Sequence, residues 1–301
     1  MKIVVLGGGD SPERDVSLRS AKSVAAAAQT AGFEVIEADP KDGLSFLDEL
    51  DDILVFPILH GVNGEDGVLQ GQLEEKGLPY LGSDSSSSAN CFDKWQTRLV
   101  LLEQAIPMAQ ASLVTKESYR QSPLAKAPHV LKINHGGSSI GTLIVRQPDV
   151  VNQKDIDAIF EMENQAVLEQ LIDGTEITIP ILDKTALPVI EIIPPSDSEF
   201  DYENKYNGRT QELCPPVSVS EELQRQAQKL AEKVHFVMGC RHLSRVDIML
   251  DKTGKLHVLE INTIPGMTDQ SLYPKAAKVA GIDMPKLIKQ FTELIQRDYK
   301  L

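Results

Sequence analysis

A β-hairpin pattern over residues 244–262 constrains this chain more than any other stretch of its sequence. Two runs of alternating apolar and polar residues flank a short polar turn. If the turn centres on Thr253-Gly254, strand pairing places the carboxylates of Asp247 and Glu260 opposite each other on one face. The same register places the apolar side chains on the other face, namely Val246, Ile248, Leu259 and Ile261. The pattern therefore predicts a hairpin with one oily face and one charged face.

The charged face of this hairpin has the composition of a magnesium site. Two carboxylates held about 5 Å apart repel each other and raise one pKa unless a cation neutralises them. Beside them, Arg245 would lie opposite Asn262. Hard oxygen ligands suit Mg²⁺, which usually binds substrate phosphates as well. Simple exposure of the charged face to solvent is the alternative. Residues 262–272 favour the magnesium site, because this Gly- and Pro-bearing loop can turn backbone N–H groups toward an anion.

Composition limits the class of protein. With 301 residues, of which 42% are hydrophobic and 25% charged, the chain has the profile of a soluble globular protein of two or three compact units. Its formal net charge of −14 argues against a nucleic-acid-binding surface. No apolar stretch reaches the roughly 18 residues of a membrane span, and the opening apolar run is too short for a signal peptide. We therefore expect no membrane partner, a cytoplasmic location, and three reduced thiols at Cys91, Cys214 and Cys240.

Residues 1–88 alternate strands and helices, the pattern of an α/β unit with a doubly wound parallel sheet. Apolar and amphipathic runs predict strands at residues 2–6, 33–37 and 53–59, and helices at 16–30 and 68–76. The loop over residues 60–67 would follow the carboxyl end of the third strand, where open α/β sheets place ligands. A dinucleotide site is disfavoured, because Pro12 stands where the third glycine of the G-x-G-x-x-G motif would be.

The rest of the chain predicts two α+β units, over residues 89–178 and 179–301. A long helix over residues 89–104, containing Asp93-Lys94, would open the first of them. Later patterns predict strands at 129–133, 142–146, 166–170, 176–182 and 187–193, and helices at 154–162 and 221–237. A polar loop over residues 194–216 is longer than ordinary connections, which indicates a functional or a disordered segment.

Three further motifs carry candidate binding groups, each with a structural alternative. Lys132 precedes a Gly- and Ser-rich loop that could fold over phosphates or form a flexible hairpin. It is not a Walker loop, because no Gly-Lys-Ser/Thr opens a helix. Glu169 and Glu176 flank a turn and could contact adenine and ribose hydroxyls, or only solvent. Glu13, at a helix start, could complement the helix dipole or receive a substrate ammonium.

Taken together, the motifs resemble one family. In order and joint spacing, the chain is similar to the D-alanine–D-alanine ligases, which are ATP-grasp enzymes, over nearly its whole length. The matching segments are GGDSPERDVSL (residues 8–18), HGVNGEDGVLQG (60–71), LPYLGS (78–83), Asp93-Lys94, GSSIG (137–141), DYENKY (201–206), RVD (245–247) and EINTIPGMT (260–268).

The resemblance implies a role for each motif. ATP would be held by Lys94, Lys132, Ser139, Glu169, Leu171, Ile172 and Glu176. Two Mg²⁺ ions, which Mn²⁺ can replace, would be held by Asp247, Glu260 and Asn262. The first D-alanine would meet Glu13 and His60, with Ser138 linking Glu13 to Tyr206 and with Lys205 also in the substrate site. Arg245 and the backbone of Gly266 would steady the transferring phosphate and the oxyanion. The carboxylate of the second D-alanine would be received by Ser271 and Leu272.

The implied activity is the ATP-dependent joining of two D-alanine molecules for peptidoglycan precursors. ATP would convert the first carboxylate to D-alanyl phosphate, a step that needs positioning and charge neutralisation rather than a protein nucleophile. A lid must exclude water, and the loops around Ser138 and Tyr206 are the candidates. Tyr206 favours an amine acceptor. The alternatives are D-lactate or D-serine as acceptor, or a nucleotide-binding regulator without turnover. A homodimer, usual in the family, is expected.

Two residues depart from the family pattern. Ile133 follows Lys132 where proline is usual, and Gly136 stands where the family usually has glutamate. Glycine lacks both a side chain and a φ restraint. The departures therefore predict a more mobile phosphate loop in this chain.

Overall fold

The first sheet is parallel and is covered on both faces. In the computed structural model, which describes residues 1–137, 140–195 and 210–301, its strands are β1 (Lys2–Leu6), β2 (Glu34–Ala38) and β3 (Ile53–Pro57), in the order β2-β1-β3. One face packs on α1 (Arg14–Thr30), and the other packs on the 3₁₀ turn η2 (Ser45–Glu49) and on α2 (Val68–Glu75). A second 3₁₀ turn, η1 (Pro40–Asp42), follows β2. Burial on both faces explains the unbroken apolar runs of β1 and β3, and the predicted parallel sheet is confirmed.

The single helix predicted over residues 89–104 is wrong, because the structure has two helices there, α3 (Ser85–Phe92) and α4 (Lys94–Glu103). The break falls at Asp93, whose ψ of 105° is extended. The Asp93 carboxylate accepts a hydrogen bond of 2.7 Å from the backbone N–H of Gln96, which caps α4. Lys94 therefore lies in the first turn of a helix rather than in the middle of one.

The second sheet is antiparallel. Its strands are β4 (Ala111–Val114), β5 (His129–Ile133), β6 (Thr142–Val145) and β7 (Ala166–Gln170), in the order β4-β7-β5-β6. The helices α5 (Lys116–Gln121) and α6 (Gln153–Met162) pack with its strands in one core, near the turns η3 (Leu124–Lys126) and η4 (Pro148–Val150). Because side chains alternate along a strand, Val130 and Lys132 point to the other face, where they line a cavity.

The third sheet contains the predicted hairpin. Its strands are β8 (Gly174–Leu182), β10 (Ile190–Ile193), β11 (Gln211–Leu213), β12 (Leu243–Asp251) and β13 (Leu256–Asn262), in the antiparallel order β11-β10-β8-β12-β13, with the short β9 (Thr185–Ala186) beside β8. The helix α8 (Glu221–Val237) covers one face of β8 and β12. The helices α9 (Leu272–Val279) and α10 (Met284–Tyr299) follow the hairpin.

The charged end of the hairpin has the predicted register, although its turn differs from the prediction. The polar pairs are Asp247 with Glu260 and Arg245 with Asn262. The turn centres on Thr253 rather than between Thr253 and Gly254, since Leu250 pairs with Leu256. If that pairing continued without interruption, Asp247 would lie opposite Leu259 rather than Glu260.

A β-bulge at Leu259 brings Glu260 opposite Asp247 instead. Ile248 pairs with Val258, whereas the neighbouring Asp247 pairs with Glu260, so Leu259 has no partner of its own on β12. The prediction that Leu259 lies on the apolar face is therefore wrong. Instead, Leu259 and Glu260 both line the cavities described below.

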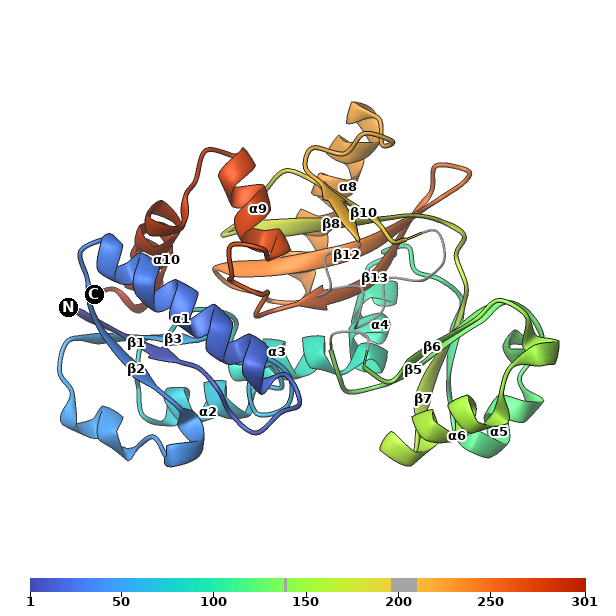
Figure 1. The fold of residues 1–301 in the computed structure, drawn as a ribbon, viewed down its shortest axis with the longest axis horizontal. Helices are drawn as coiled ribbons and strands as arrows, with labels where there is room; N and C mark the ends of the chain where they lie inside the picture. Colours follow the sequence, from blue (N-terminus) through green and yellow to red (C-terminus); the bar gives the residue numbers. More distant parts are fainter. Residues whose placement is uncertain (138–139, 196–209) are drawn as a thin grey trace.

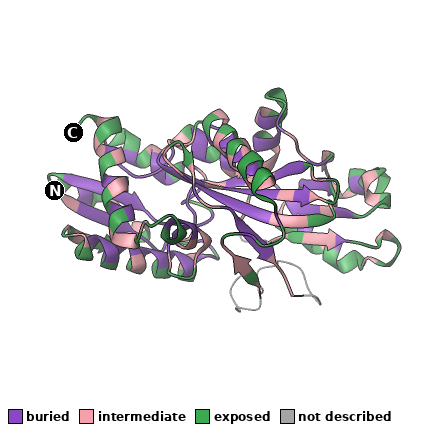
Figure 2. Cartoon of the chain, turned by 90° about the horizontal axis from the view of Figure 1, so that it is seen from above, coloured by how far each residue is buried: buried purple, intermediate pink, exposed green. Residues whose placement is uncertain are grey.

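The first and third sheets share one hydrophobic core, whereas the second has a separate core. In Figure 1, α10 lies beside α1, and the ring of Phe291 on α10 meets the ring of Phe56 on β3 edge-on at 6.5 Å. Figure 2 shows buried residues along the strands and exposed residues on the outer faces of the helices. The predicted divisions after residues 88 and 178 stay a proposal, and residue 178 lies within β8. In the described ranges, no helix is long and apolar enough to cross a membrane.

Candidate functional site

Two cavities with a common wall lie where the three sheets meet. The larger has a volume of about 730 Å³ and the smaller about 260 Å³. The common wall is formed by Lys94, Gly136, Gly137, Leu259 and Glu260. A molecule that fills the smaller cavity can therefore reach one that occupies the larger.

Each predicted site residue within the described part of the chain lines one of these cavities. The larger is lined by Glu13, His60, Arg245, Asn262, Gly266, Ser271 and Leu272. The smaller is lined by Lys132, Glu169, Leu171, Ile172, Glu176 and Asp247. Both are lined by Lys94 and Glu260. Four predicted residues, Ser138, Ser139, Lys205 and Tyr206, lie outside the described residues.

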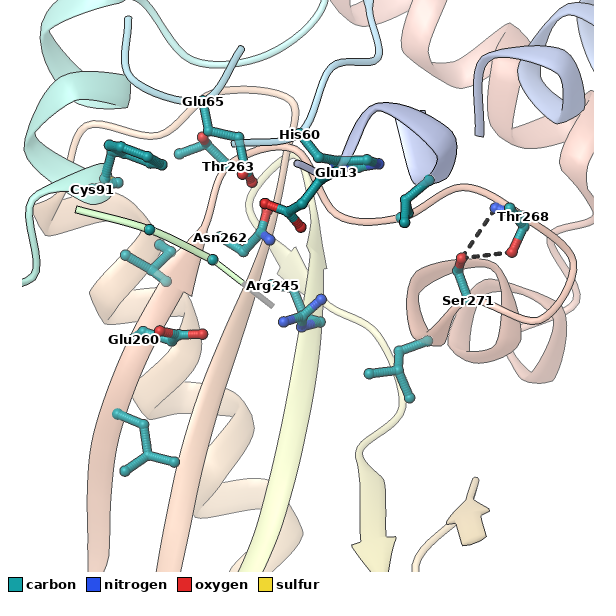
Figure 3. Close-up of a pocket in the computed structure, with 18 of the residues that line it drawn as sticks. Glu13, His60, Glu65, Cys91, Arg245, Glu260, Asn262, Thr263, Thr268 and Ser271 are labelled. Carbon is teal, nitrogen blue, oxygen red and sulfur yellow. Dashed lines mark hydrogen bonds between the residues drawn. The ribbon is translucent and has the colours of Figure 1, made fainter. Parts of the chain in front are cut away.

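The hairpin places a bidentate ion pair on the floor of the site. Arg245 donates from Nε to Asp247 Oδ1 at 2.9 Å and from Nη2 to Asp247 Oδ2 at 2.7 Å. The Thr178 hydroxyl on β8 also donates to Asp247. Burial acts to lower the pKa of the Arg245 guanidinium, but Asp247 and the carboxylates of Glu260 and Glu65 raise it on balance. Arg245 is thus a fixed cation in the lining of the larger cavity (Figure 3).

The donor set for a metal ion consists of the Asp247 and Glu260 carboxylates and the Asn262 amide. Asp247 and Glu260 are directly paired across the hairpin, and Asn262 is two residues beyond Glu260 on the same face of β13. The amide oxygen of Asn262 accepts a hydrogen bond of 2.8 Å from the backbone N–H of Ile264. Among the described residues, no group of three or more His, Cys, Asp or Glu side chains is arranged to hold a metal ion. Carboxylate and amide oxygens suit Mg²⁺ that also binds phosphates. These three side chains therefore fit a Mg²⁺ site that phosphate oxygens complete, rather than one made of protein ligands alone.

Two buried carboxyl groups and a buried histidine form one corner of the larger cavity (Figure 3). The Glu65 carboxylate accepts a hydrogen bond of 2.7 Å from the backbone N–H of Gly61. Burial and the nearby Glu13 carboxylate raise the pKa of Glu65 to about 8. Burial lowers the pKa of His60 to about 4, so its ring is neutral at pH 7. His60 Nε2 lies 3.3 Å from the Ser20 hydroxyl oxygen.

The smaller cavity has a buried cation and a buried anion on its wall. Lys132 Nζ on β5 lies 2.8 Å from Glu169 Oε2 on β7. Burial acts to lower the pKa of Lys132, but Glu169 and Glu260 raise it on balance. Burial lowers the pKa of Lys94, whose ammonium group donates to the backbone oxygen of Gly136. Lys94 belongs to the common wall, and Lys132 lines the smaller cavity only, so a phosphate chain that runs from the smaller cavity to the wall could contact both.

The start of α9 faces the far end of the larger cavity. The Ser271 hydroxyl accepts a hydrogen bond of 3.1 Å from the Thr268 N–H, and the two hydroxyl oxygens are 2.8 Å apart, as the dashed lines in Figure 3 show. A Cβ atom at Gly266 would lie 2.8 Å from the Ser271 hydroxyl, so a glycine is needed for this close approach. Helix N-termini favour anions, and Leu272 is the first residue of this one.

Sequence reasoning missed several charged residues of the larger cavity, among them Glu65, Glu212 and Lys275. Glu65 lies in the loop after β3, and its position beyond the carboxyl end of a parallel strand was a usable signal. Glu212 on β11 and Lys275 on α9 form an ion pair at the Ser271 end of the cavity. They are 63 positions apart in the sequence, so no local pattern could have joined them.

Two antiparallel sheets that close on a cavity lined by lysines and carboxylates place this fold in the ATP-grasp class. Residues 100–293 match the family model described as "D-ala D-ala ligase C-terminus". The chain belongs to the D-alanine–D-alanine ligase family, which confirms the resemblance drawn from its motifs.

Relatives along the whole chain agree with this assignment. The D-alanine–D-alanine ligases of Mannheimia succiniciproducens and Gloeobacter violaceus are 36% and 39% identical, over 97% of this chain and over 97% and 99% of theirs. The crystal structure of the ligase from Bacillus anthracis has a TM-score of 0.86 at 33% identity, covering 100% of this chain and 99% of that one. The same enzyme complexed with ATP has a TM-score of 0.85 at 32% identity, with 100% and 98% covered.

Proposed function

We propose that the protein joins two D-alanine molecules to D-alanyl-D-alanine with hydrolysis of ATP to ADP and phosphate. The observation that carries this proposal is the common wall of the two cavities at Lys94 and Glu260. A nucleotide in the smaller cavity would present its γ-phosphate to a substrate in the larger one. Relatives that bear the name of this activity, and one that binds ATP, support the assignment.

The smaller cavity would hold ATP. Glu169, Leu171 and Ile172 would contact the adenine, and Glu176 the ribose. Lys94 and Lys132 would neutralise the phosphates, with Lys132 turning from Glu169 toward the nucleotide. Mg²⁺ bound by Asp247, Glu260, Asn262 and the phosphates would offset the charge that develops during phosphoryl transfer.

The larger cavity would hold the first D-alanine with its carboxylate beside the common wall. The Glu13 carboxylate would bind its ammonium group, while the neutral ring of His60 would lie near its carboxyl group. The carboxylate oxygen attacks the γ-phosphorus, the bond to the β-phosphate oxygen breaks, and D-alanyl phosphate and ADP result. Arg245 and the Gly266 backbone would stabilise the negative charge of the transferring group.

The second D-alanine would bind at the start of α9. Its carboxylate would be received by Ser271 and the Leu272 N–H, which leaves its amine free to attack the acyl carbon. The tetrahedral oxyanion would then collapse with loss of phosphate. Ser138, Ser139, Lys205 and Tyr206, proposed for the lid and for phosphate contacts, lie outside the described residues. The peptidoglycan role, the homodimer and the cytoplasmic location stay predictions.

Product analysis tests the proposed function directly. Phosphate release would be measured with Mg-ATP and D-alanine, with L-alanine, and with D-alanine plus D-lactate or D-serine, and the products identified by mass. Release with D-alanine alone and the mass of the dipeptide are the expected result. A mixed product in preference to the dipeptide would instead indicate another acceptor. ATP binding without release in any mixture would indicate a nucleotide-binding regulator.

Replacing Glu260 by glutamine tests the role of the common wall. Removing one negative charge from the metal ligands should lower turnover on the order of a hundredfold or more, since Lewis-acid charge stabilisation is worth several kcal/mol. The matched control is Glu222→Gln on α8, which makes the same charge change at an exposed position. Turnover would be measured over a range of Mg²⁺ concentrations, and thermal unfolding would verify the fold of both variants. Normal turnover in Glu260→Gln would contradict the metal role.

A further inference from the structure

His135 bridges two carboxylates at the base of the phosphate loop. Its Nδ1 lies 2.7 Å from Glu163 Oε1, and its Nε2 lies 3.1 Å from Asp93 Oδ2. The side chain of His135 is 48% exposed, while those of Asp93 and Glu163 are 31% and 25% exposed. Glu163 ends α6 and Asp93 caps α4, so the imidazole connects two helices that pack in different parts of the molecule.

The same carboxylates also hold the backbone that leads into the phosphate loop. Glu163 Oε2 accepts hydrogen bonds from the backbone N–H groups of Asn134 at 2.8 Å and His135 at 3.1 Å. Asn134 in turn fixes the first turn of α4, because its backbone oxygen accepts from the Lys94 N–H at 3.1 Å. Its side-chain oxygen accepts from the Trp95 N–H at 2.8 Å. The position of Lys94 is thereby tied to residues 134–136.

We propose that His135 is a positioning residue for the nucleotide phosphates, whose doubly protonated ring clamps α4 and α6 onto the phosphate loop and whose clamp loosens when the ring loses one proton. The proposal rests on the proposed function, since Lys94 is there assigned to the phosphates. His135 itself touches neither substrate nor nucleotide in this assignment.

The dependence on protonation follows from the number of donors. A neutral imidazole has one N–H and can donate to only one of two carboxylates, whereas the charged ring donates to both. Burial acts to raise the pKa of Asp93, but hydrogen bonds from Gln96, Asn134 and His135 hold it below its ordinary value, so this carboxylate stays charged. The groups that face the ring are the Asp93 and Glu163 carboxylates, the Asn134 amide and the Phe92 ring.

Exposure sets His135 apart from the other histidines. All six lie within the described ranges, and the other five are buried, namely His60, His129, His235, His242 and His257. Solvent reaches the ring of His135 in the folded protein, so its protonation can change without local unfolding.

Direct nucleotide binding as a function of pH tests the proposal. Titration calorimetry with Mg-ADP and with a non-hydrolysable Mg-ATP analogue, between pH 6 and 8.5, would compare the natural protein with H135R, H135Q and E163Q. Arginine keeps a cation that can reach both carboxylates at every pH, whereas glutamine never carries a charge. The control is D157N, which removes a carboxylate on α6 that pairs with Lys116. Protonation of the nucleotide itself affects all variants alike. The quantity to compare is therefore the ratio of the dissociation constants of two variants at the same pH.

Between pH 6 and 8.5, the dissociation constants of the natural protein and of D157N should rise about two- to fivefold more than that of H135R. This is the range expected of partly exposed charge pairs. H135Q and E163Q should bind weakly at every pH, without that extra rise. Equal pH dependence in the natural protein, H135R and H135Q, with nucleotide binding intact, would overturn the proposal alone. Absence of nucleotide binding in all of them would overturn the proposed function and this inference together.

Discussion

Glu65 is a carboxyl group in surroundings that favour its protonated form. Its folded pKa of about 8 lies above the ordinary value of 4.5, because the group is buried near Glu13. The folded protein therefore holds a proton between these pH values that the unfolded chain has released. The resulting stability is complete below about pH 4.5 and is lost as the pH rises through about 8.

Replacing Glu65 by glutamine should remove this pH dependence. Glutamine keeps an oxygen for the Gly61 N–H but does not titrate. Between pH 5 and 8.5, the free energy of unfolding of the natural protein should fall on the order of a few kcal/mol more than that of Glu65→Gln. Urea titrations at several pH values measure this difference, and the buried histidines cancel in it. Parallel curves for the two proteins would contradict the assignment.

Ile133 and Gly136, the two departures from the family pattern, are in contact. A Cβ atom at Gly136 would lie 2.7 Å from Cδ1 of Ile133, and one at Gly141 would lie 2.9 Å from the same atom. The isoleucine thus fills space that a side chain at position 136 would need. The sequence shows that these two residues depart from the family pattern, but it does not show that they pack against each other. The loop mobility inferred from Gly136 alone therefore stays a prediction.

At the scale of elements, patterns with several repeats predicted structure well. The strands at 129–133 and 166–170 and the helix at 221–237 have the predicted bounds, because each repeats its strand or helix period over several residues. The break at Asp93 could not be predicted in this way. A capping residue such as Asp93 divides a helix in two only where the chain also bends. That bend depends on contacts with residues far along the chain, His135 among them.

The ion pair between Glu212 and Lys275 should support the acceptor end of the site. It joins β11, which follows the polar loop, to α9, whose first turn follows Ser271. Glu212→Lys and Lys275→Glu should each raise the KM of the second D-alanine, roughly two- to fivefold for a partly exposed pair. The double variant, in which the charges are exchanged, should recover most of the loss. Initial rates over D-alanine concentration measure the effect, with the KM of ATP as the internal control. An additive loss in the double variant would show that the pair itself does not matter.

At the scale of the whole molecule, the shared core couples segments from both ends of the chain. Phe291 on α10 is 1% exposed and contacts the rings of Phe56 and Tyr273. Residues from β1, β3, α1, α9 and α10 belong to one core, whereas the second sheet has a separate core around Leu131. The sequence could predict three groups of elements but not this division, because a shared core depends on contacts between residues more than 200 positions apart.

Phe291→Leu should therefore speed local opening in both the first and the third sheet units. Leucine fills only part of the volume of the lost ring, so the free energy of unfolding of these units should fall by about 1–2 kcal/mol. Hydrogen exchange followed by mass spectrometry should show faster exchange in β1, β3 and α10, with β5 and β7 unchanged. Leu131→Val, in the separate core, should show the opposite distribution. Uniformly faster exchange in both variants would mean that the molecule opens as one unit.

The position of the turn and the bulge of the hairpin belong together. Pairing that starts from a turn centred on Thr253 would make Leu259 the partner of Asp247, and the unpaired Leu259 brings Glu260 opposite Asp247 instead. If the turn between Leu250 and Leu256 lost one residue but kept its present shape, Ile248 would pair with Leu259, and Asp247 would still pair with Glu260 without a bulge. Deleting Leu259 itself would leave the same charged pair. Natural variants that are one residue shorter in this hairpin should therefore lack the bulge and keep Asp247 opposite Glu260. A sequence alignment that places their gap at the turn or at position 259 assigns Asp247 the same partner in both cases.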